Sequence, residues 1–289
     1  NAPWAWPLAF WKMDWAMSPL LIAFSALPAP RLEKPIANTF LIIRPDHLGD
    51  NLLTTPSVTA LADAMPDARL IGLTGDWAAP VLAAYPQIER VLTLPFPGFT
   101  RAPKGSIWQP YAMALHWAQR VRTLRAEVAL IMRPDHWWGA LLAYLAGIPV
   151  RVGYDLPDVA PFLTRPLPFA RGHVVRQCLR LVEAWTGVVP DHDVRYAFPQ
   201  DADDHAAIRS MLDSRGLTSA DQLADRLGAR AIFTGSDSEQ AQITDVLAHM
   251  AHPGVSLAGD TNVGQLAALY AQAQIVLGSD SGPLHLAVA

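Results

Sequence analysis

The sequence has few of the residues that hold small extracellular domains or metal clusters together. Its 289 residues include one cysteine, Cys178, which excludes an intrachain disulfide framework and any site built from several thiolates. Charged residues make up only 17% of the chain against 51% hydrophobic residues, and this composition excludes a disordered protein. The net charge is −4, so no global basic field attracts nucleic acid. We therefore expect a folded protein without a nucleic-acid partner.

Long apolar runs are also missing. No segment reaches the roughly 20 uninterrupted apolar residues that a membrane-spanning helix needs. Residues 1–38 come nearest, but prolines interrupt them, and they are rich in tryptophan. Tryptophan side chains suit a bilayer interface, and packing on the protein's own surface is the alternative. We predict an N-terminal arm over 1–38 and leave both alternatives open.

After residue 38, short apolar runs alternate with helical patterns. Buried strands are predicted at 40–43, 69–73, 90–94 and 128–132, and again at 231–234, 255–257 and 275–278. Strands that alternate with helices predict a parallel sheet with right-handed crossovers. We therefore predict an α/β protein with two Rossmann-like domains, an N-terminal one over 39–198 and a C-terminal one over 199–289.

The tetrapeptide Arg-Pro-Asp-His occurs twice, at 44–47 and 133–136, each time directly after an apolar strand. Ligands of open parallel sheets bind beyond the carboxyl ends of the strands. Each copy alone could simply end its strand, but two copies together favour a polar pocket. Six polar side chains then share one rim: Arg44, Asp46, His47, Arg133, Asp135 and His136.

A second junction, Asp280-Ser281-Gly282-Pro283, lies between an apolar run and the start of a helix. Exposed backbone amides at a helix N-terminus favour phosphate or diphosphate, and proline at the first helical position loses no hydrogen bond. Ordinary capping is the alternative reading of this junction. We predict that Ser281 and Gly282 help to bind a diphosphate.

Several of these segments resemble one known family. Their order and spacing resemble those of glycosyltransferase family 9, the ADP-heptose:lipopolysaccharide heptosyltransferases. The matching segments are the opening strand and loop 41–56, then 141–153, 173–176, 257–261, 265–269 and 280–287 (DSGPLHLA). The resemblance runs from about residue 40 to residue 289. It implies a GT-B fold, in which two Rossmann-like domains face each other across a cleft.

The resemblance also implies an activity. We expect an inverting, metal-independent transfer of heptose from ADP-heptose to a lipopolysaccharide core or related surface glycan. The nucleotide sugar and the lipid-linked acceptor are the expected partners, and no further cofactor or metal is expected. Such an enzyme is expected in the cytoplasm, with peripheral contact at the cytoplasmic face of the inner membrane as a further expectation.

The resemblance assigns roles to individual residues. Asp50 matches the catalytic aspartate of the family, which acts as general base. Donor contacts fall on Thr261, Asp280, Ser281, Gly282 and His285. The acceptor that the resemblance implies bears carboxylates or phosphates, which basic side chains at the strand ends and in the helical segment can bind. The expected acceptor contacts are Arg44, His47, Arg133, His136 and Arg176. For each arginine taken separately, an ion pair within the protein is the alternative.

Two departures from the family pattern leave another function open. The usual strand and basic residue at the start of the C-terminal domain are missing between Asp213 and Ala220, and the chain stops at Ala289. We therefore expect an incomplete C-terminal domain. The alternative function is an inactive nucleotide-sugar-binding or scaffold protein of the same fold. An epimerase built on paired Rossmann domains is disfavoured, because no Gly-x-Gly-x-x-Gly and no Walker A motif occur.

Overall fold

The computed structural model describes residues 36–99, 106, 108–189, 197–214, 231–250, 254–278 and 282–289. The N-terminal arm lies almost wholly outside these residues. Residues 220–227, where the sequence pattern predicts a helix, also lie outside them, as do Asp280 and Ser281. The chain divides into two compact units, residues 1–196 and 197–289, where the sequence suggested a boundary after residue 198. Each unit is described by itself.

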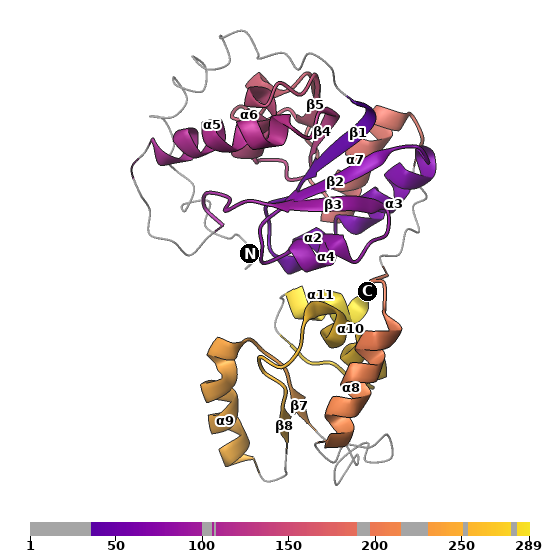
Figure 1. The fold of residues 1–289 in the computed structure, drawn as a ribbon, viewed down its shortest axis with the longest axis vertical. Helices are drawn as coiled ribbons and strands as arrows, with labels where there is room; N and C mark the ends of the chain where they lie inside the picture. The colour runs from indigo at the N-terminus through magenta and orange to yellow at the C-terminus, as the bar shows by residue number, and fades with distance from the viewer. Residues whose placement is uncertain are drawn as a thin grey trace, which may run out of the picture. The chain divides into compact units, whose positions relative to one another are not determined.

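The first unit is built on a six-stranded, wholly parallel sheet (Figure 1). Its strands are β1 (Ile36–Ile43), β2 (Arg69–Thr74), β3 (Ile88–Thr93), β4 (Ala126–Ile131), β5 (Val150–Tyr154) and β6 (Arg165–Leu167). The spatial order is β3-β2-β1-β4-β5-β6, which is the order of a doubly wound nucleotide-binding sheet. The chain therefore changes direction across the sheet between β1 and β4, where such folds bind ligands.

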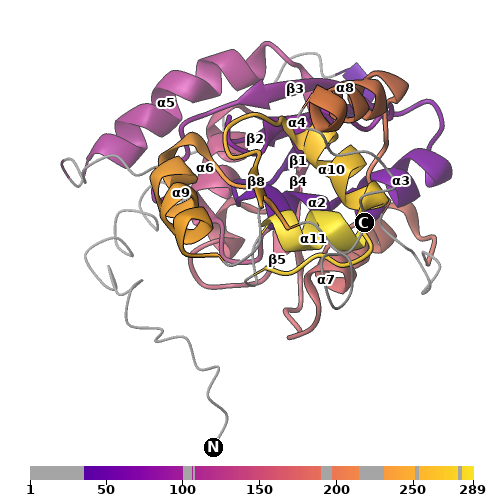
Figure 2. The same ribbon diagram turned by 90° about the horizontal axis from the view of Figure 1, so that it is seen from below.

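Helices cover both faces of this sheet. They are α2 (Leu48–Leu52), α3 (Thr55–Ala64), α4 (Ala79–Ala83), α5 (Gln109–Arg122), α6 (Trp137–Leu145), the 3₁₀ helix η2 (Ala160–Phe162) and α7 (Val174–Thr186). Helices α5 and α6 pack together on one face, and α3 and α7 pack together on the other (Figures 1 and 2). The alternation of β1 explains this arrangement, because successive strand side chains point to opposite faces. Leu41 and Ile43 join the α5–α6 core, while Phe40 meets the Trp185 ring of α7 edge-on, with centroids 5.8 Å apart.

The second unit is smaller. It contains α8 (Ala202–Ser214), β7 (Ile232–Phe233), the 3₁₀ helix η3 (Asp237–Glu239), α9 (Gln240–His249), β8 (Val255–Ser256), α10 (Val263–Gln272) and α11 (Gly282–Val288). Strands β7 and β8 are parallel, and buried Ile208, Leu257 and Leu269 centre its core. The spacing of Asn262 and Gln265 in the sequence predicts a capping box at the start of α10, and the structure confirms it. The Gln265 amide donates to Asn262 Oδ1 at 2.8 Å, and the Asn262 amide donates to Gln265 Oε1 at 3.0 Å.

Two details differ from the sequence-based expectations. The strand predicted at 275–278 is wrong, since these residues pair with no strand of the described chain. The side chain of Leu277 is 90% exposed there, so the apolar run has neither the neighbour nor the burial that a core strand needs. The strands β5 and β6 had not been predicted. Residues 165–167 contain a proline, which is compatible with their position at the edge of the sheet.

Candidate functional site

The two Arg-Pro-Asp-His segments meet at the carboxyl edge of the central strands. Ile43 and Ile131 lie side by side in the register of β1 and β4, and the Met132 amide extends the pairing by donating to Ile43 O at 3.0 Å. Arg44 and Arg133 follow these pairs directly. The sheet thus places both arginines at the point where the strand order reverses, as the repeated motif predicted.

Arg44 is held entirely by the protein. Arg44 is 3% exposed, and one terminal nitrogen of its guanidinium donates to Met132 O at 2.8 Å. Nε forms an ion pair with Asp46 Oδ2 at 2.8 Å, and the second terminal nitrogen donates to Asp50 Oδ1 at 3.1 Å. Because all three nitrogens are engaged, Arg44 serves the geometry of the site rather than offering a free cation to a ligand.

Asp46 joins the two strand ends. Its buried carboxylate, whose side chain is 4% exposed, pairs with Arg44 through one oxygen and with an Arg133 terminal nitrogen through the other. Arg133 also forms a two-pronged pair with Asp135, at 2.6 and 3.1 Å. Burial acts to lower the pKa of Arg133, but the hydrogen bond to Asp135 and the charge of Asp46 outweigh it and raise that pKa. Arg133 therefore stays charged at every accessible pH.

Asp50 is one of two accessible carboxylates in this cluster, and unlike Asp135 it does not pair both oxygens with an arginine. It lies in the short helix α2 with a side chain that is 42% exposed. The described residues give Oδ1 a single partner, Arg44, and give Oδ2 none. The backbone of Asp50 is held as well, because the Thr54 hydroxyl donates to Asp50 O at 2.9 Å. The structure therefore fixes one oxygen of Asp50 and leaves the other open to an incoming proton.

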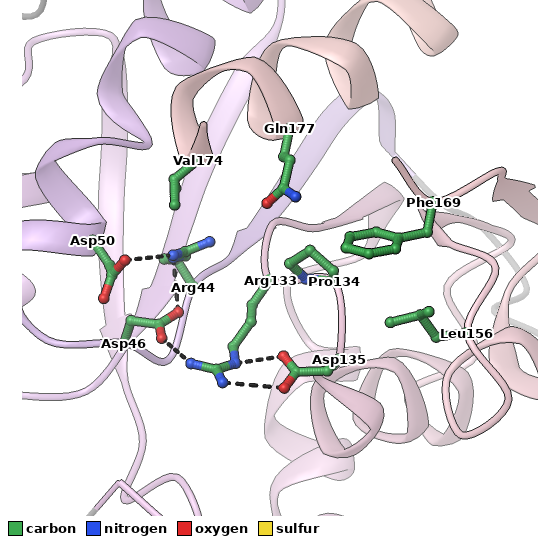
Figure 3. Close-up of a pocket in the computed structure, with 10 residues that line it drawn as sticks. All are labelled: Arg44, Asp46, Asp50, Arg133, Pro134, Asp135, Leu156, Phe169, Val174 and Gln177. Carbon is green, nitrogen blue, oxygen red and sulfur yellow. Dashed lines mark hydrogen bonds and ion pairs between the residues drawn. The ribbon is translucent and has the colours of Figure 1, made fainter. Parts of the chain in front are cut away.

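A cavity of about 330 Å³ opens onto these groups (Figure 3). Arginines and carboxylates form one wall, and apolar or amide side chains form the opposite one. The lining residues are Arg44, Asp46, Asp50, Arg133, Pro134, Asp135, Leu156, Phe169, Val174 and Gln177. Figure 3 shows the ion pairs running from Asp50 through Arg44, Asp46 and Arg133 to Asp135. A polar wall facing an apolar one suits a sugar, which carries hydroxyl groups and apolar ring faces.

Three of the residues assigned to the acceptor do not line this cavity. His47 is exposed beside the rings of Trp77 and Phe99. His136 is buried, and among the described residues neither of its ring nitrogens has a hydrogen-bond partner. Burial, aided by the charge of Arg133, lowers the pKa of His136 to about 3, so the ring is neutral. Arg176 is exposed on α7, one residue before the cavity-lining Gln177.

The donor assignments fall in the second unit. Thr261 and His285 are partly exposed, His285 within α11, and Gly282 is the first residue of that helix. The other two donor residues, Asp280 and Ser281, lie outside the described residues. The described parts of the chain contain no group of three or more His, Cys, Asp or Glu side chains able to hold a metal ion. They also contain no helix long and apolar enough to cross a bilayer.

Some groups of the site were not assigned from sequence. Asp46 was placed on the rim, but its pairing with both arginines depends on the register of β1 against β4, which a linear sequence does not reveal. Phe169, Leu156 and Gln177 line the cavity from segments without a motif. The only sequence signal near them was the helical pattern that predicted α7, which brings Gln177 to the sheet.

Comparisons with known proteins agree with this fold. The sequence profile described as glycosyltransferase family 9 (heptosyltransferase) matches residues 220–289. Lipopolysaccharide heptosyltransferase 3 of Escherichia coli is 24% identical over 272 residues, which cover 83% of this chain and 77% of that protein. A solved family 9 glycosyltransferase from Veillonella parvula superposes with a TM-score of 0.72 at 19% identity, over 90% of this chain and 79% of its own. Heptosyltransferase II of E. coli superposes with a TM-score of 0.67 at 17% identity, and the match covers 86% of this chain and 81% of that enzyme's chain.

These likenesses define the chain first as an α/β protein with the fold of GT-B glycosyltransferases. The profile of glycosyltransferase family 9 matches residues 220–289, and most of the chain is similar to a heptosyltransferase. Together these matches support a glycosyltransferase enzyme.

Proposed function

We propose that this glycosyltransferase transfers heptose from ADP-heptose to a lipid-linked acceptor of the lipopolysaccharide core or of a related surface glycan, with inversion and without a metal ion. The E. coli relative is named a lipopolysaccharide heptosyltransferase. A further solved E. coli heptosyltransferase, which superposes with a TM-score of 0.65 at 17% identity, is described with ADP-2-deoxy-2-fluoro heptose. It covers 86% of this chain and 85% of its own.

The observation that carries the proposal is the environment of the two carboxylate oxygens of Asp50. One oxygen is held by Arg44 and the other is open at a cavity of sugar size. In the proposed reaction this oxygen takes the proton of the acceptor hydroxyl while that hydroxyl oxygen bonds to the anomeric carbon. The bond from the anomeric carbon to the diphosphate oxygen breaks, and ADP leaves with the electron pair. Attack from the face opposite the leaving group inverts the anomeric centre.

The remaining site assignments concern the acceptor and the donor. Arg133 lines the cavity with a partly exposed guanidinium, but Asp46 and Asp135 engage all three of its nitrogens, so an acidic acceptor sugar would have to displace one of these carboxylates. Asp280, Ser281 and Gly282 are proposed to receive the diphosphate, with Thr261 beside the adenine and His285 at the donor. Peripheral contact with the inner membrane belongs to the same proposal, because the acceptor is lipid-linked.

The substitution D50N tests the base. It keeps the shape of the side chain and removes its ability to take a proton, so we expect kcat to fall about 10²- to 10⁴-fold with the affinity for ADP-heptose unchanged by calorimetry. The exposed Asp63 of α3 offers a control, and D63N should transfer heptose at the wild-type rate. If D50N kept the wild-type rate, Asp50 would not be the base.

The donor is tested by calorimetric titration with ADP-, GDP- and UDP-sugars. We expect binding of ADP-heptose and at least about tenfold weaker binding of the uridine and guanosine donors, a difference of about 1.4 kcal/mol. A preference for a uridine donor would contradict the heptose assignment. Binding of ADP-heptose without transfer to any acceptor would instead favour the nucleotide-sugar-binding alternative.

A further inference from the structure

The geometry points to Asp46 as a positioning residue, which holds Arg44 against Asp50 and couples the charge of Asp50 to that of Arg133. This inference rests on the proposed function for its kinetic consequence. Asp46 touches neither the substrate nor the reacting atoms in that proposal. It acts through Arg44, whose Nε lies 2.8 Å from its Oδ2.

The position of Asp46 is fixed from several sides. The Trp77 indole donates to Asp46 O at 3.0 Å, and the Asn51 side-chain amide donates to the same oxygen at 2.7 Å. Asn51 is itself fixed, since its Oδ1 accepts from the Thr74 hydroxyl of β2 at 3.2 Å. The backbone of Asp46 is therefore fixed by Trp77 and by Asn51 of α2, and Thr74 of β2 holds Asn51 in turn.

Burial makes this carboxylate necessary. The side chains of Arg44 and Asp46 are each 4% exposed, and a buried guanidinium without a matching anion is strongly unfavourable. Asp50 offers Arg44 only one oxygen, at 3.1 Å, from a side chain that water reaches. Asp46 is thus the buried counter-charge that Arg44 needs, and Asp50 shares the same guanidinium.

Charge determines the direction of the effect. The charged and titratable groups that interact with Asp50 or with each other across this cluster come from the segment after β1, the segment after β4, and α7: Arg44, Asp46, Arg133, Asp135, His136 and Cys178. If Asp46 loses its charge, Arg44 has Asp50 as its remaining anion and stabilises the negative form of that carboxylate more strongly. Asp50 then accepts a proton less readily. Loss of Arg133 makes Asp50 accept a proton more readily. It removes a positive charge from the cluster, and Asp46 then pairs with Arg44 only, so Arg44 stabilises the Asp50 carboxylate less.

The kinetic test compares the pH dependence of kcat, at saturating donor and acceptor, for the wild type, D46N and R133Q. We expect the acid limb to move to lower pH by about 0.5 unit or more in D46N, with a lower kcat, and to higher pH in R133Q. A purely structural role would reduce the folded fraction and leave both limbs in place. Unmoved limbs would overturn the inference. Because Arg133 is partly exposed, R133Q keeps the test available if D46N does not fold.

A second measurement does not depend on activity. In the full-length protein labelled with ¹⁵N-arginine, the Nε–H of Arg44, assigned with R44K, should exchange slowly with water. We expect exchange to be at least about tenfold faster in D46N and unchanged in D50N, because the ion pair with Asp46, and not the contact with Asp50, keeps the buried Nε in place. The control E89Q breaks the exposed pair between Arg69 and Glu89 and should alter only the Arg69 signals. Slow Arg44 exchange in D46N would overturn the inference, whether or not the protein transfers heptose.

Discussion

The hydroxyl of Thr54 lies 3.7 Å from the sulfur of Cys178 on α7 and donates to the carbonyl of Asp50 at 2.9 Å. Cys178 in turn approaches Met132 O, again at 3.7 Å. The same carbonyl accepts from Arg44. One buried thiol therefore lies between the helix that carries Asp50 and the strand that precedes Arg133. Through its contacts with Thr54 and Met132, Cys178 links α7 to the segments that carry Asp50 and Arg133.

Cys178 should be chemically inert in the folded protein. The side chain is fully buried, and burial raises the pKa of its thiol, so little thiolate forms. We expect no reaction with a disulfide reagent at pH 8 within an hour, and one thiol per chain after unfolding in guanidinium chloride. Rapid reaction of the native protein would show that the interior between α7 and the central strands opens, contrary to this packing.

The close packing of α6 on β1 predicts a sensitive glycine. A Cβ at Gly139 would overlap Nδ1 of His136 and lie 3.0 Å from Ile43 Cγ2. We expect G139A to lower the free energy of unfolding by about 1–3 kcal/mol through overpacking, measured by urea denaturation. Gly172 is the matched control, because a Cβ there meets no atom within 4 Å. G172A should change stability by less than about 1 kcal/mol, and an equal loss in both variants would contradict the packing argument.

Local sequence signals predicted much of this fold. The apolar runs of β1, β2 and β4 and the Asn262–Gln265 capping box depend on neighbours in the chain, and all are present. The run at 275–278 shows the limit of such signals. A strand needs a partner, and an apolar tetrapeptide does not specify whether one is available.

The site could be predicted only in part for a similar reason. The repeated Arg-Pro-Asp-His motif identified the correct edge of the sheet and brought Arg44 and Arg133 together. It did not show that Asp46 would be shared between them, because that pairing depends on the register of β1 against β4. Nor did it show that His136 points into an aromatic cluster, where its ring lies 5.4 Å from that of Phe96, while Asp135 faces the cavity.

His136 gives the molecule a pH-dependent stability. In an unfolded chain its pKa is about 6.5, whereas in the folded protein burial, with the charges of Arg133 and Arg44, lowers that pKa to about 3. Between these values the unfolded chain binds a proton that the folded protein does not. The free energy of unfolding therefore falls as the pH drops below about 6.5, by about 2 kcal/mol at pH 5 relative to pH 8.

Urea denaturation at several pH values from 4.5 to 8 measures how the free energy of unfolding depends on pH. In H136F the new ring joins Phe96, Phe99 and Trp138, which already surround the position, and the unfolded chain no longer gains that proton. We expect the H136F curve to be flatter by about 2.7 kcal/mol over this range. H249Q, at a histidine whose side chain is 78% exposed, should keep the wild-type slope. Parallel curves for the wild type and H136F would show that the buried ring takes up its proton without unfolding, and hence that a polar partner reaches it inside the aromatic cluster.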